Sequence, residues 1–78
     1  LADFNITCVS MSADSNQFLG KPLKELNLRV EFGINILGIK RKEMLMQNIQ
    51  PDDVLLQGDR VYIQGKQSNI EQFYKLVK

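Results

Sequence analysis

The sequence has no histidine, a single cysteine and only isolated glycines, and each absence excludes a class of function. Without histidine, the commonest general base and metal ligand is missing. One cysteine, Cys8, excludes an internal disulfide framework and a cysteine-rich zinc site. No glycine-rich loop could cradle a phosphate, and the serines have no base partner that would activate them. We therefore expect neither an enzyme nor a metal or cofactor site.

Two further absences concern membranes and polyanions. No stretch approaches the roughly 18 apolar residues of a membrane-spanning helix, and the opening LADFNITCVSMSAD lacks the basic start and apolar core of a signal peptide. Ten Lys and Arg against nine Asp and Glu leave a net charge of +1, too balanced for a protein that mainly binds a phosphate backbone. The sequence therefore predicts no direct contact with nucleic acid, and its single cysteine fits a reducing compartment.

The length of 78 residues predicts one domain, residues 1–78. A chain of this size buries only about 60% of the surface that it exposes when unfolded, so its stability is modest. Because the sequence starts at Leu1 rather than at a methionine, we expect a fragment of a longer protein.

Apolar periodicity and turn residues divide the chain into six elements. The predicted strands cover residues 4–11, 34–39, 44–49 and 60–65, and the predicted helices cover 22–31 and a C-terminal stretch capped by Ser68. Gly33 can adopt the left-handed conformation that ends the first helix. The order β-α-β-β-β-α predicts an α+β sandwich of two layers, with a mainly antiparallel sheet and two helices.

The C-terminal helix has both a start signal and an apolar stripe. Ser68 is the expected N-cap, and Glu71 three residues later completes a capping box. The residues expected on its buried face are Ile70, Phe73, Tyr74 and Val77.

Three other groups of side chains receive structural interpretations. Cys8 lies in a predicted strand, and we interpret it as a small buried hydrophobic residue. Met44 and Met46 share one strand face and are expected to pack in the core, with an adaptable contact surface as the alternative. The adjacent carboxylates at 52–53 follow Pro51, and we expect them to form a turn rather than a metal or acid–base site.

The predicted hairpin has three consecutive cations at its tip, Lys40, Arg41 and Lys42. An exposed turn collects charge because charge is well solvated there. Alternatively, Lys and Arg on a rigid tip can pair with a phosphate or another anion. Both interpretations remain open at this point.

Four motifs in register resemble a known family. Residues 20–29 (GKPLKELNLR) resemble its "G-K-x-L-x-E-L-x-L-R" helix, and residues 32–41 (FGINILGIKR) resemble its following "y-G-v-x-v-l-a-I-x-R" strand. Residues 51–61 (PDDVLLQGDRV) resemble "P-x-x-x-x-l-x-x-G-D-x-l", and Gly65 with its helix resembles the closing motif. The sequence thus resembles the TrkA-C domain, the C-terminal subdomain of RCK proteins, over about residues 4–76.

The resemblance implies a cytoplasmic regulatory domain of a bacterial potassium channel, transporter or cation–proton antiporter. It also implies a homodimer attached to a membrane transport domain or an RCK N-terminal subdomain, and in several family members the dimer cleft binds cyclic di-AMP. The positions that the resemblance assigns to the ligand are Ile36, Leu37, Lys42, Asn48 and Ile49, with Lys40 and Arg41 as secondary anion candidates.

Three hypotheses follow from this resemblance. The first is a sensor of a small anionic ligand at a two-fold cleft in a potassium transport system. The second is a plain dimerisation module, and the third is the sensor domain of a DNA-binding regulator whose reader lies in another segment. The strand at 34–39 has more apolar positions than one helical layer can cover, which favours a symmetric dimer under all three.

Overall fold

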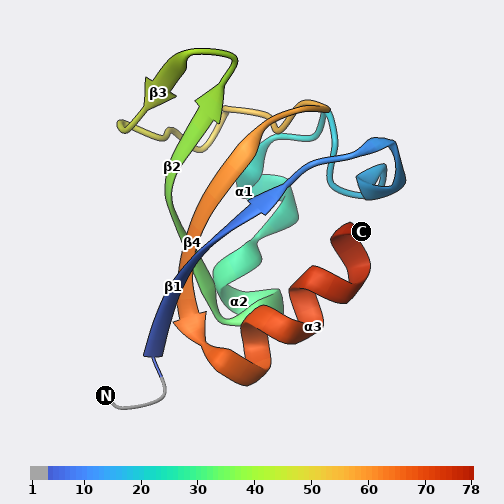
Figure 1. The fold of residues 1–78 in the computed structure, drawn as a ribbon, viewed down its shortest axis with the longest axis vertical. Helices are drawn as coiled ribbons and strands as arrows, with labels where there is room; N and C mark the ends of the chain where they lie inside the picture. Colours follow the sequence, from blue (N-terminus) through green and yellow to red (C-terminus); the bar gives the residue numbers. More distant parts are fainter. Residues whose placement is uncertain (1–3) are drawn as a thin grey trace.

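The structure, a computed structural model, describes residues 4–78, and its elements follow the predicted order with one helix divided in two (Figure 1). In chain order the elements are β1 (Phe4–Ser10), the 3-10 helix η1 (Ala13–Ser15), α1 (Leu23–Leu26), α2 (Leu28–Phe32), β2 (Ile34–Arg41), β3 (Met44–Met46), β4 (Arg60–Lys66) and α3 (Gln67–Val77).

Within residues 4–78 the sheet has four strands in the order β1-β4-β2-β3, and each neighbouring pair is antiparallel. β4 lies between β1 and β2 and pairs with both. β3 pairs only with residues 39–41 of β2, so the first half of β2 has no other strand beside its outer edge in the described chain. The register of β2 against β4 shifts between Ile36 and Gly38, which places Leu37 in a bulge.

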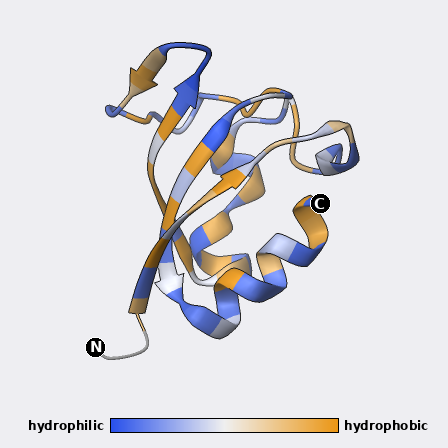
Figure 2. Cartoon of the chain, in the orientation of Figure 1, coloured by the Kyte–Doolittle hydropathy of each residue, from blue (hydrophilic) through white to orange (hydrophobic). Residues whose placement is uncertain are grey.

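The helices cover one face of the sheet, and the hydrophobic core fills the space between the two layers (Figure 1). Hydrophobic and hydrophilic positions alternate along the strands, so one face is apolar enough to bury (Figure 2). Phe18, Phe32 and Phe73 meet at the centre of the helical layer, with ring centroids 5.1 to 5.9 Å apart. The predicted two-layer α+β fold is confirmed. No helix among residues 4–78 has the length and apolar character needed to cross a membrane.

The single helix predicted over residues 22–31 is wrong, because Asn27 divides it into α1 and α2. Asn27 has φ 50° and ψ 53°, the left-handed region that asparagine tolerates better than most residues. Its N–H donates to Leu23 O and ends α1. The apolar spacing changes at the same place, from Leu23 and Leu26 to Leu28. α2 ends at Gly33 in the predicted left-handed conformation, with φ 69°.

The start of α3 also differs from the prediction. The helix begins at Gln67 with Lys66 as its N-cap residue, so Ser68 lies inside the first turn and makes no capping hydrogen bond. Gln67 Nε2 instead donates to Glu71 Oε2 at 3.1 Å. Tyr74 is exposed, whereas the other three residues of the predicted stripe are buried, namely Ile70, Phe73 and Val77.

Two side chains expected in the core are exposed. Cys8 precedes the buried Val9 on β1, so it points to the uncovered face of the sheet. Met44 is 73% exposed, and only Met46 packs against the core. The pattern of β1 does not reveal which face is buried, and Met44 is exposed, although it shares the face of Met46, because it lies directly after the turn at residues 42–43. The return strand is also shorter than predicted, because β3 ends at Met46.

Arg41 at the end of β2 forms an ion pair with the buried Asp59. Its Nε donates to Asp59 Oδ1 at 2.9 Å, and its Nη2 donates to Asp59 Oδ2 at 2.8 Å and to Val54 O at 2.9 Å. Leu56 N–H donates to the same carboxylate at 2.9 Å. The expected tip of three cations is therefore wrong: the turn consists of residues 42–43, and Arg41 faces the body of the domain.

Burial alone would raise the pKa of Asp59. The hydrogen bonds from Arg41 and Leu56, together with the charge of Arg41, outweigh burial and hold that pKa below its ordinary value of 3.8. Because the folded pKa is lower than the unfolded one, the ionised carboxylate stabilises the fold above the unfolded pKa. This contribution is lost as the pH falls through the folded pKa.

We expect Asp59→Asn to lower the free energy of unfolding by about 2–3 kcal/mol at pH 7, because a neutral amide replaces a carboxylate that accepts charge-assisted hydrogen bonds. Urea denaturation followed by circular dichroism measures this loss. Asparagine does not titrate, so the difference between the two proteins should shrink below the unfolded pKa of Asp59.

The matched control is Glu25→Gln, which removes a carboxylate from an exposed position with no ion pair or side-chain hydrogen bond in the described chain. This variant should unfold like the wild type. A difference between Asp59→Asn and wild type that stays constant from pH 7 to pH 2 would contradict the assigned role of the ionised pair.

Candidate functional site

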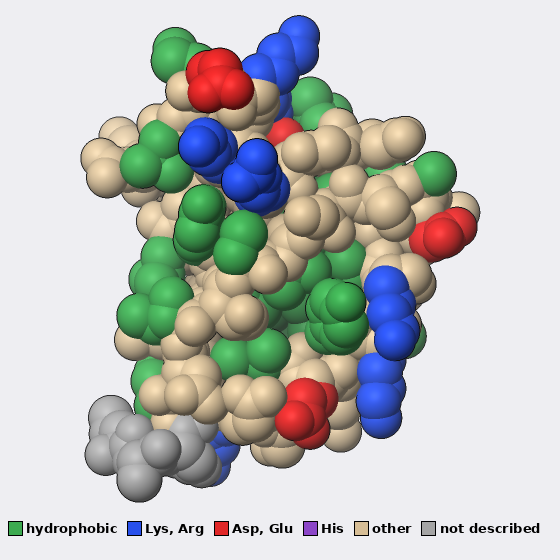
Figure 3. Space-filling view, in the orientation of Figure 1, with side chains coloured by type: hydrophobic (Ala, Val, Ile, Leu, Met, Phe, Trp, Pro, Cys, Tyr) green, Lys and Arg blue, Asp and Glu red, His purple; other side chains and the backbone are tan. Residues whose placement is uncertain are grey.

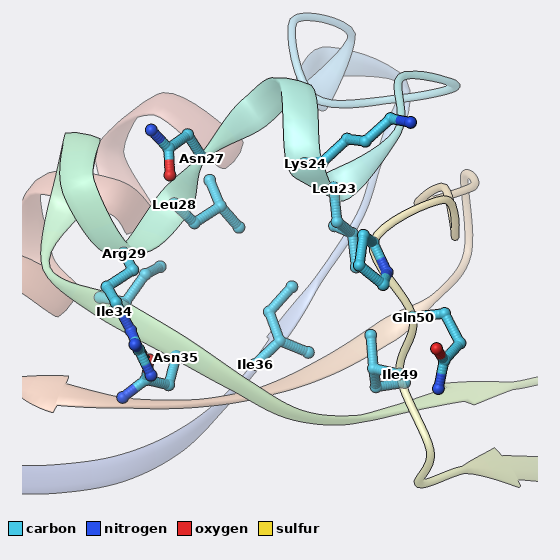
Figure 4. A pocket seen from close by; sticks show the side chains of 11 residues that line it. Leu23, Lys24, Asn27, Leu28, Arg29, Ile34, Asn35, Ile36, Ile49 and Gln50 are labelled. Carbon is cyan, nitrogen blue, oxygen red and sulfur yellow. Dashed lines mark hydrogen bonds between the residues drawn. The ribbon is translucent and has the colours of Figure 1, made fainter.

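A groove of about 510 Å³ lies between the α1–α2 helices, β2 and the segment that follows β3 (Figure 4). Its apolar lining comes from all three segments: Leu23, Leu28, Ile34, Ile36, Ile49 and Pro51. Ile36 points from β2 into the space below the helices, and Ile49 closes that space from the other side (Figure 4). The groove therefore offers an apolar wall to the uncharged part of a ligand.

The remaining lining is polar and contains no carboxylate. Its members are two cations and three amides: Lys24, Arg29, Asn27, Asn35 and Gln50. Arg29 and Asn35 lie together at one end of the groove, and Gln50 lies toward the other (Figure 4). Arg29 Nε donates to Asn35 Oδ1 at 3.0 Å, whereas Lys24 Nζ pairs with Asp52 at 2.8 Å on the surface.

The segment beside β2 is held in place by a turn at residues 50–53. The predicted turn is confirmed: residues 51–52 form it, and Asp53 Oδ2 accepts a hydrogen bond from Gln50 N–H at 2.8 Å. Two backbone bonds then attach this turn to α1, from Leu23 N to Asp53 O at 2.9 Å and from Lys24 N to Pro51 O at 3.0 Å. The position of Ile49 and Gln50 in the groove follows from these contacts.

The structure separates the residues that the family resemblance assigned to a ligand. Ile36 and Ile49 line the groove. Asn48 is exposed next to the groove, and its backbone and side-chain oxygens accept from Gln50 Nε2 at 3.4 and 3.0 Å. Leu37 lies on the opposite face of β2, as the alternation of a strand dictates for the neighbour of Ile36. Lys42 lies at the exposed turn with φ 55°.

A second hollow, of about 450 Å³, lies on the uncovered face of the sheet, where β2 meets β3. Its lining includes Leu37, Lys40, Leu45 and Tyr62. On the face shown in Figure 3, Lys and Arg side chains gather at the hairpin end, above a band of hydrophobic side chains. Of the two secondary anion candidates, Lys40 therefore lines this hollow, whereas Arg41 is engaged by Asp59.

Sequence reasoning did not single out Asn27, Arg29, Asn35 or Gln50 as groove residues. Arg29 and Asn35 lie on different elements, and only the turn at Gly33 brings them together. The change of apolar spacing around Asn27 was the one available signal that a loop-like position interrupts the helix. No group of three or more metal-ligating side chains that could hold an ion occurs within residues 4–78.

Comparison with known proteins identifies the family. The TrkA-C domain family matches residues 9–78, and the chain belongs to this family. It is 38% identical over 58 residues to a probable potassium channel protein of Methanocaldococcus jannaschii, a match that covers 74% of this chain. It is 29% identical over 63 residues, 81% of this chain, to the uncharacterized transporter YfbS of Escherichia coli. The matched part spans only 17% and 10% of these two relatives.

The fold is shared with RCK C domains, that is, C domains of regulators of potassium conductance. The C domain of the potassium transport protein KtrA, in complex with cyclic di-AMP, has a TM-score of 0.82 and 24% identity, covering 95% of this chain and 84% of that one. The RCK C domain dimer of S. agalactiae BusR, in complex with the same nucleotide, has a TM-score of 0.77 and 25% identity, covering 95% and 94%. BusR in complex with promoter DNA has a TM-score of 0.70 and 23% identity, covering 95% and 36%.

Proposed function

We propose that this chain is a regulatory, non-catalytic domain of a cation transport protein, and that it senses cyclic di-AMP as a symmetric dimer. The observation that carries the proposal is the groove beside β2, with an apolar wall, a polar rim and no carboxylate. Support comes from the fold, which is shared with two RCK C domains in complex with cyclic di-AMP. A ligand that binds one arrangement of a transport protein more tightly than another shifts its state.

In this proposal each adenine packs against Ile36 and Ile49, and Asn48 contacts a phosphate. Gln50 Nε2 donates to the side-chain oxygen of Asn48, so the side-chain nitrogen of Asn48 points elsewhere and can donate to an anion. Lys42 lies on the same hairpin and adds a positive charge near the phosphates. Leu37, on the opposite face of the strand, contributes to the contact between protomers rather than to the adenine wall.

The hairpin is the surface on which we place the dimer contact. Leu37, Met44 and Leu45 are 43%, 73% and 54% exposed, an unusual amount of apolar surface for so short a segment. Exposed apolar patches of this kind mark interaction sites. We place the two-fold axis beside the hairpin so that one cyclic dinucleotide, which is itself two-fold symmetric, contacts both protomers.

One observation favours a second kind of full-length protein that could contain this domain. BusR carries an RCK C domain and forms a complex with promoter DNA, so a sensor domain of a DNA-binding regulator is the alternative to a transport protein. Because this chain has a net charge of only +1, another segment of such a protein would contact the DNA. The sequence next to this domain in its parent protein distinguishes the two alternatives: membrane-spanning helices indicate a transport protein, and a helix-turn-helix indicates a DNA-binding regulator.

Isothermal titration calorimetry on this chain tests the ligand. We expect cyclic di-AMP to bind with one nucleotide per two chains, in preference to cyclic di-GMP and ATP. Asn48→Ala should weaken binding about tenfold or more, because a hydrogen bond to a charged group is worth roughly 1.5–3 kcal/mol. Lys42→Glu should weaken it as well, through repulsion of the phosphates.

The control for this titration is Gln72→Ala, which truncates an exposed side chain on α3, outside the groove. Its affinity should equal that of the wild type. If wild type gives no heat at high micromolar cyclic di-AMP, the dimerisation-only function replaces the proposed one.

Sedimentation at micromolar concentration tests the dimer. We expect a species of twice the 9.0 kDa monomer mass, and we expect Leu45→Lys to shift the equilibrium to monomer because it places a charge in the contact. Ile6→Lys is the matched control, since Ile6 is also exposed (64%) but lies on β1 at the far edge of the sheet. Equal dissociation by both variants would contradict the placement at the hairpin, and a wild-type monomer would contradict the dimer.

A further inference from the structure

Arg29 is a cation of the groove whose charge has no partner in the described chain. The two ion pairs within residues 4–78 are Lys24–Asp52 and Arg41–Asp59, so no carboxylate neutralises Arg29. Its hydrogen-bond acceptor is the neutral amide oxygen of Asn35. The contrast with Arg41 is direct, because Arg41 gives both Nε and Nη2 to Asp59.

The hydrogen bond to Asn35 orients the Arg29 guanidinium and uses only one of its N–H donors. Only Nε donates to Asn35, and neither terminal nitrogen of Arg29 donates to a group within residues 4–78. A guanidinium presents its donors as a planar fork that matches two oxygens of one phosphate or carboxylate. Asn35 therefore fixes the direction of this fork and leaves its outer edge for a ligand.

The rest of the groove favours an anion at this end. Lys24, the other cation of the lining, is already paired with Asp52, and no carboxylate lines the groove to repel a negative charge. The wall formed by Ile36 and Ile49 begins next to Arg29 and Asn35 and can hold the uncharged part of the same ligand (Figure 4). An organic phosphate with a planar apolar group can bind Arg29 through its phosphate and the wall of Ile36 and Ile49 through its apolar group.

We propose that Arg29, positioned by Asn35, recognises a phosphate of a nucleotide bound in the groove. This inference rests on the proposed function for the choice of a nucleotide. It concerns a residue and an end of the groove that the family resemblance does not assign. Asn35 acts through Arg29 and is a positioning residue.

The test uses the 78-residue chain and two kinds of titration. In the first, 5′-AMP and adenosine are each added to ¹⁵N-labelled protein while the Arg29 Nε–Hε signal is recorded by NMR. AMP should shift that signal saturably and bind at least about tenfold more tightly than adenosine, because only AMP carries the phosphate. In the second, the dissociation constant of cyclic di-AMP is measured by calorimetry for wild type and variants.

The variants separate recognition from general charge effects. Arg29→Gln should weaken both phosphate ligands at least about tenfold. Arg60→Gln removes the same charge from an exposed arginine of β4 outside the groove, and it should leave both affinities unchanged. Asn35→Asp keeps an acceptor for Arg29 Nε but supplies a compensating carboxylate, so it should weaken binding nearly as much as Arg29→Gln. Thermal unfolding of each variant confirms that it is folded.

The outcomes distinguish this inference from the proposed function. If wild type binds cyclic di-AMP and Arg29→Gln binds it equally well, the role of Arg29 is wrong and the proposed ligand stands. If AMP shifts the Arg29 signal but cyclic di-AMP does not bind, the role of Arg29 stands and the proposed ligand is wrong. If adenosine binds as tightly as AMP, or no nucleotide shifts the Arg29 signal, the inference is overturned.

Discussion

The ion pair between Arg41 and Asp59 joins the two ends of the longest irregular segment of the domain. Arg41 ends β2, Asp59 immediately precedes β4, and the chain between them forms the short β3 and then a loop. That loop is attached to the rest of the domain at several points: Arg41 donates to Val54 O, Gly20 N–H donates to Leu55 O, and the turn of residues 50–53 is bonded to α1. Residues 49–51, one wall of the groove, belong to the same loop, so the contacts of Arg41 with Asp59 and Val54 hold its second half against β2 while the bonds to α1 hold its first half.

The groove arises where the regular elements are interrupted. Asn27 in a left-handed conformation breaks the first helix and places two short helices over β2, and the bulge at Leu37 changes which side chains of β2 face them. Local rules of structure are often violated at functional sites, and here Asn27 lines the groove and the bulge follows directly after Ile36, another groove residue.

The order of elements was predictable because each strand and the last helix carry a clear apolar period. The predictions failed where a single residue changed the geometry. The apolar periodicity does not reveal that Asn27 adopts a left-handed conformation, so the first helix was expected to be continuous. Likewise, the apolar pattern of β2 does not reveal the bulge between Ile36 and Gly38, which lets both Ile36 and Ile39 face the core although they are three residues apart.

Charged residues were the hardest to place from sequence. Lys40, Arg41 and Lys42 are consecutive, yet Lys40 lines the second hollow, Arg41 is paired with Asp59 and Lys42 lies at the turn. The alternation of a strand sends neighbours to opposite faces, so a run of like charges along a strand does not form one patch. The partner of Arg41 lies 18 residues away, a separation at which no local pattern connects the two.

The short β3 gives the domain an uneven local stability. β3 shares three residue pairs with β2, whereas β1, the other edge strand, shares seven with β4. Opening the hairpin breaks few hydrogen bonds and exposes side chains that are already largely in water, so it costs much less free energy than global unfolding. We therefore expect amide protons of residues 44–46 to exchange with solvent through local opening of the hairpin. Amide protons of β4 should exchange only when the whole domain unfolds. A molecule that binds only the closed hairpin suppresses that fluctuation, and it alters the dynamics of this edge while the sheet and helices keep their positions.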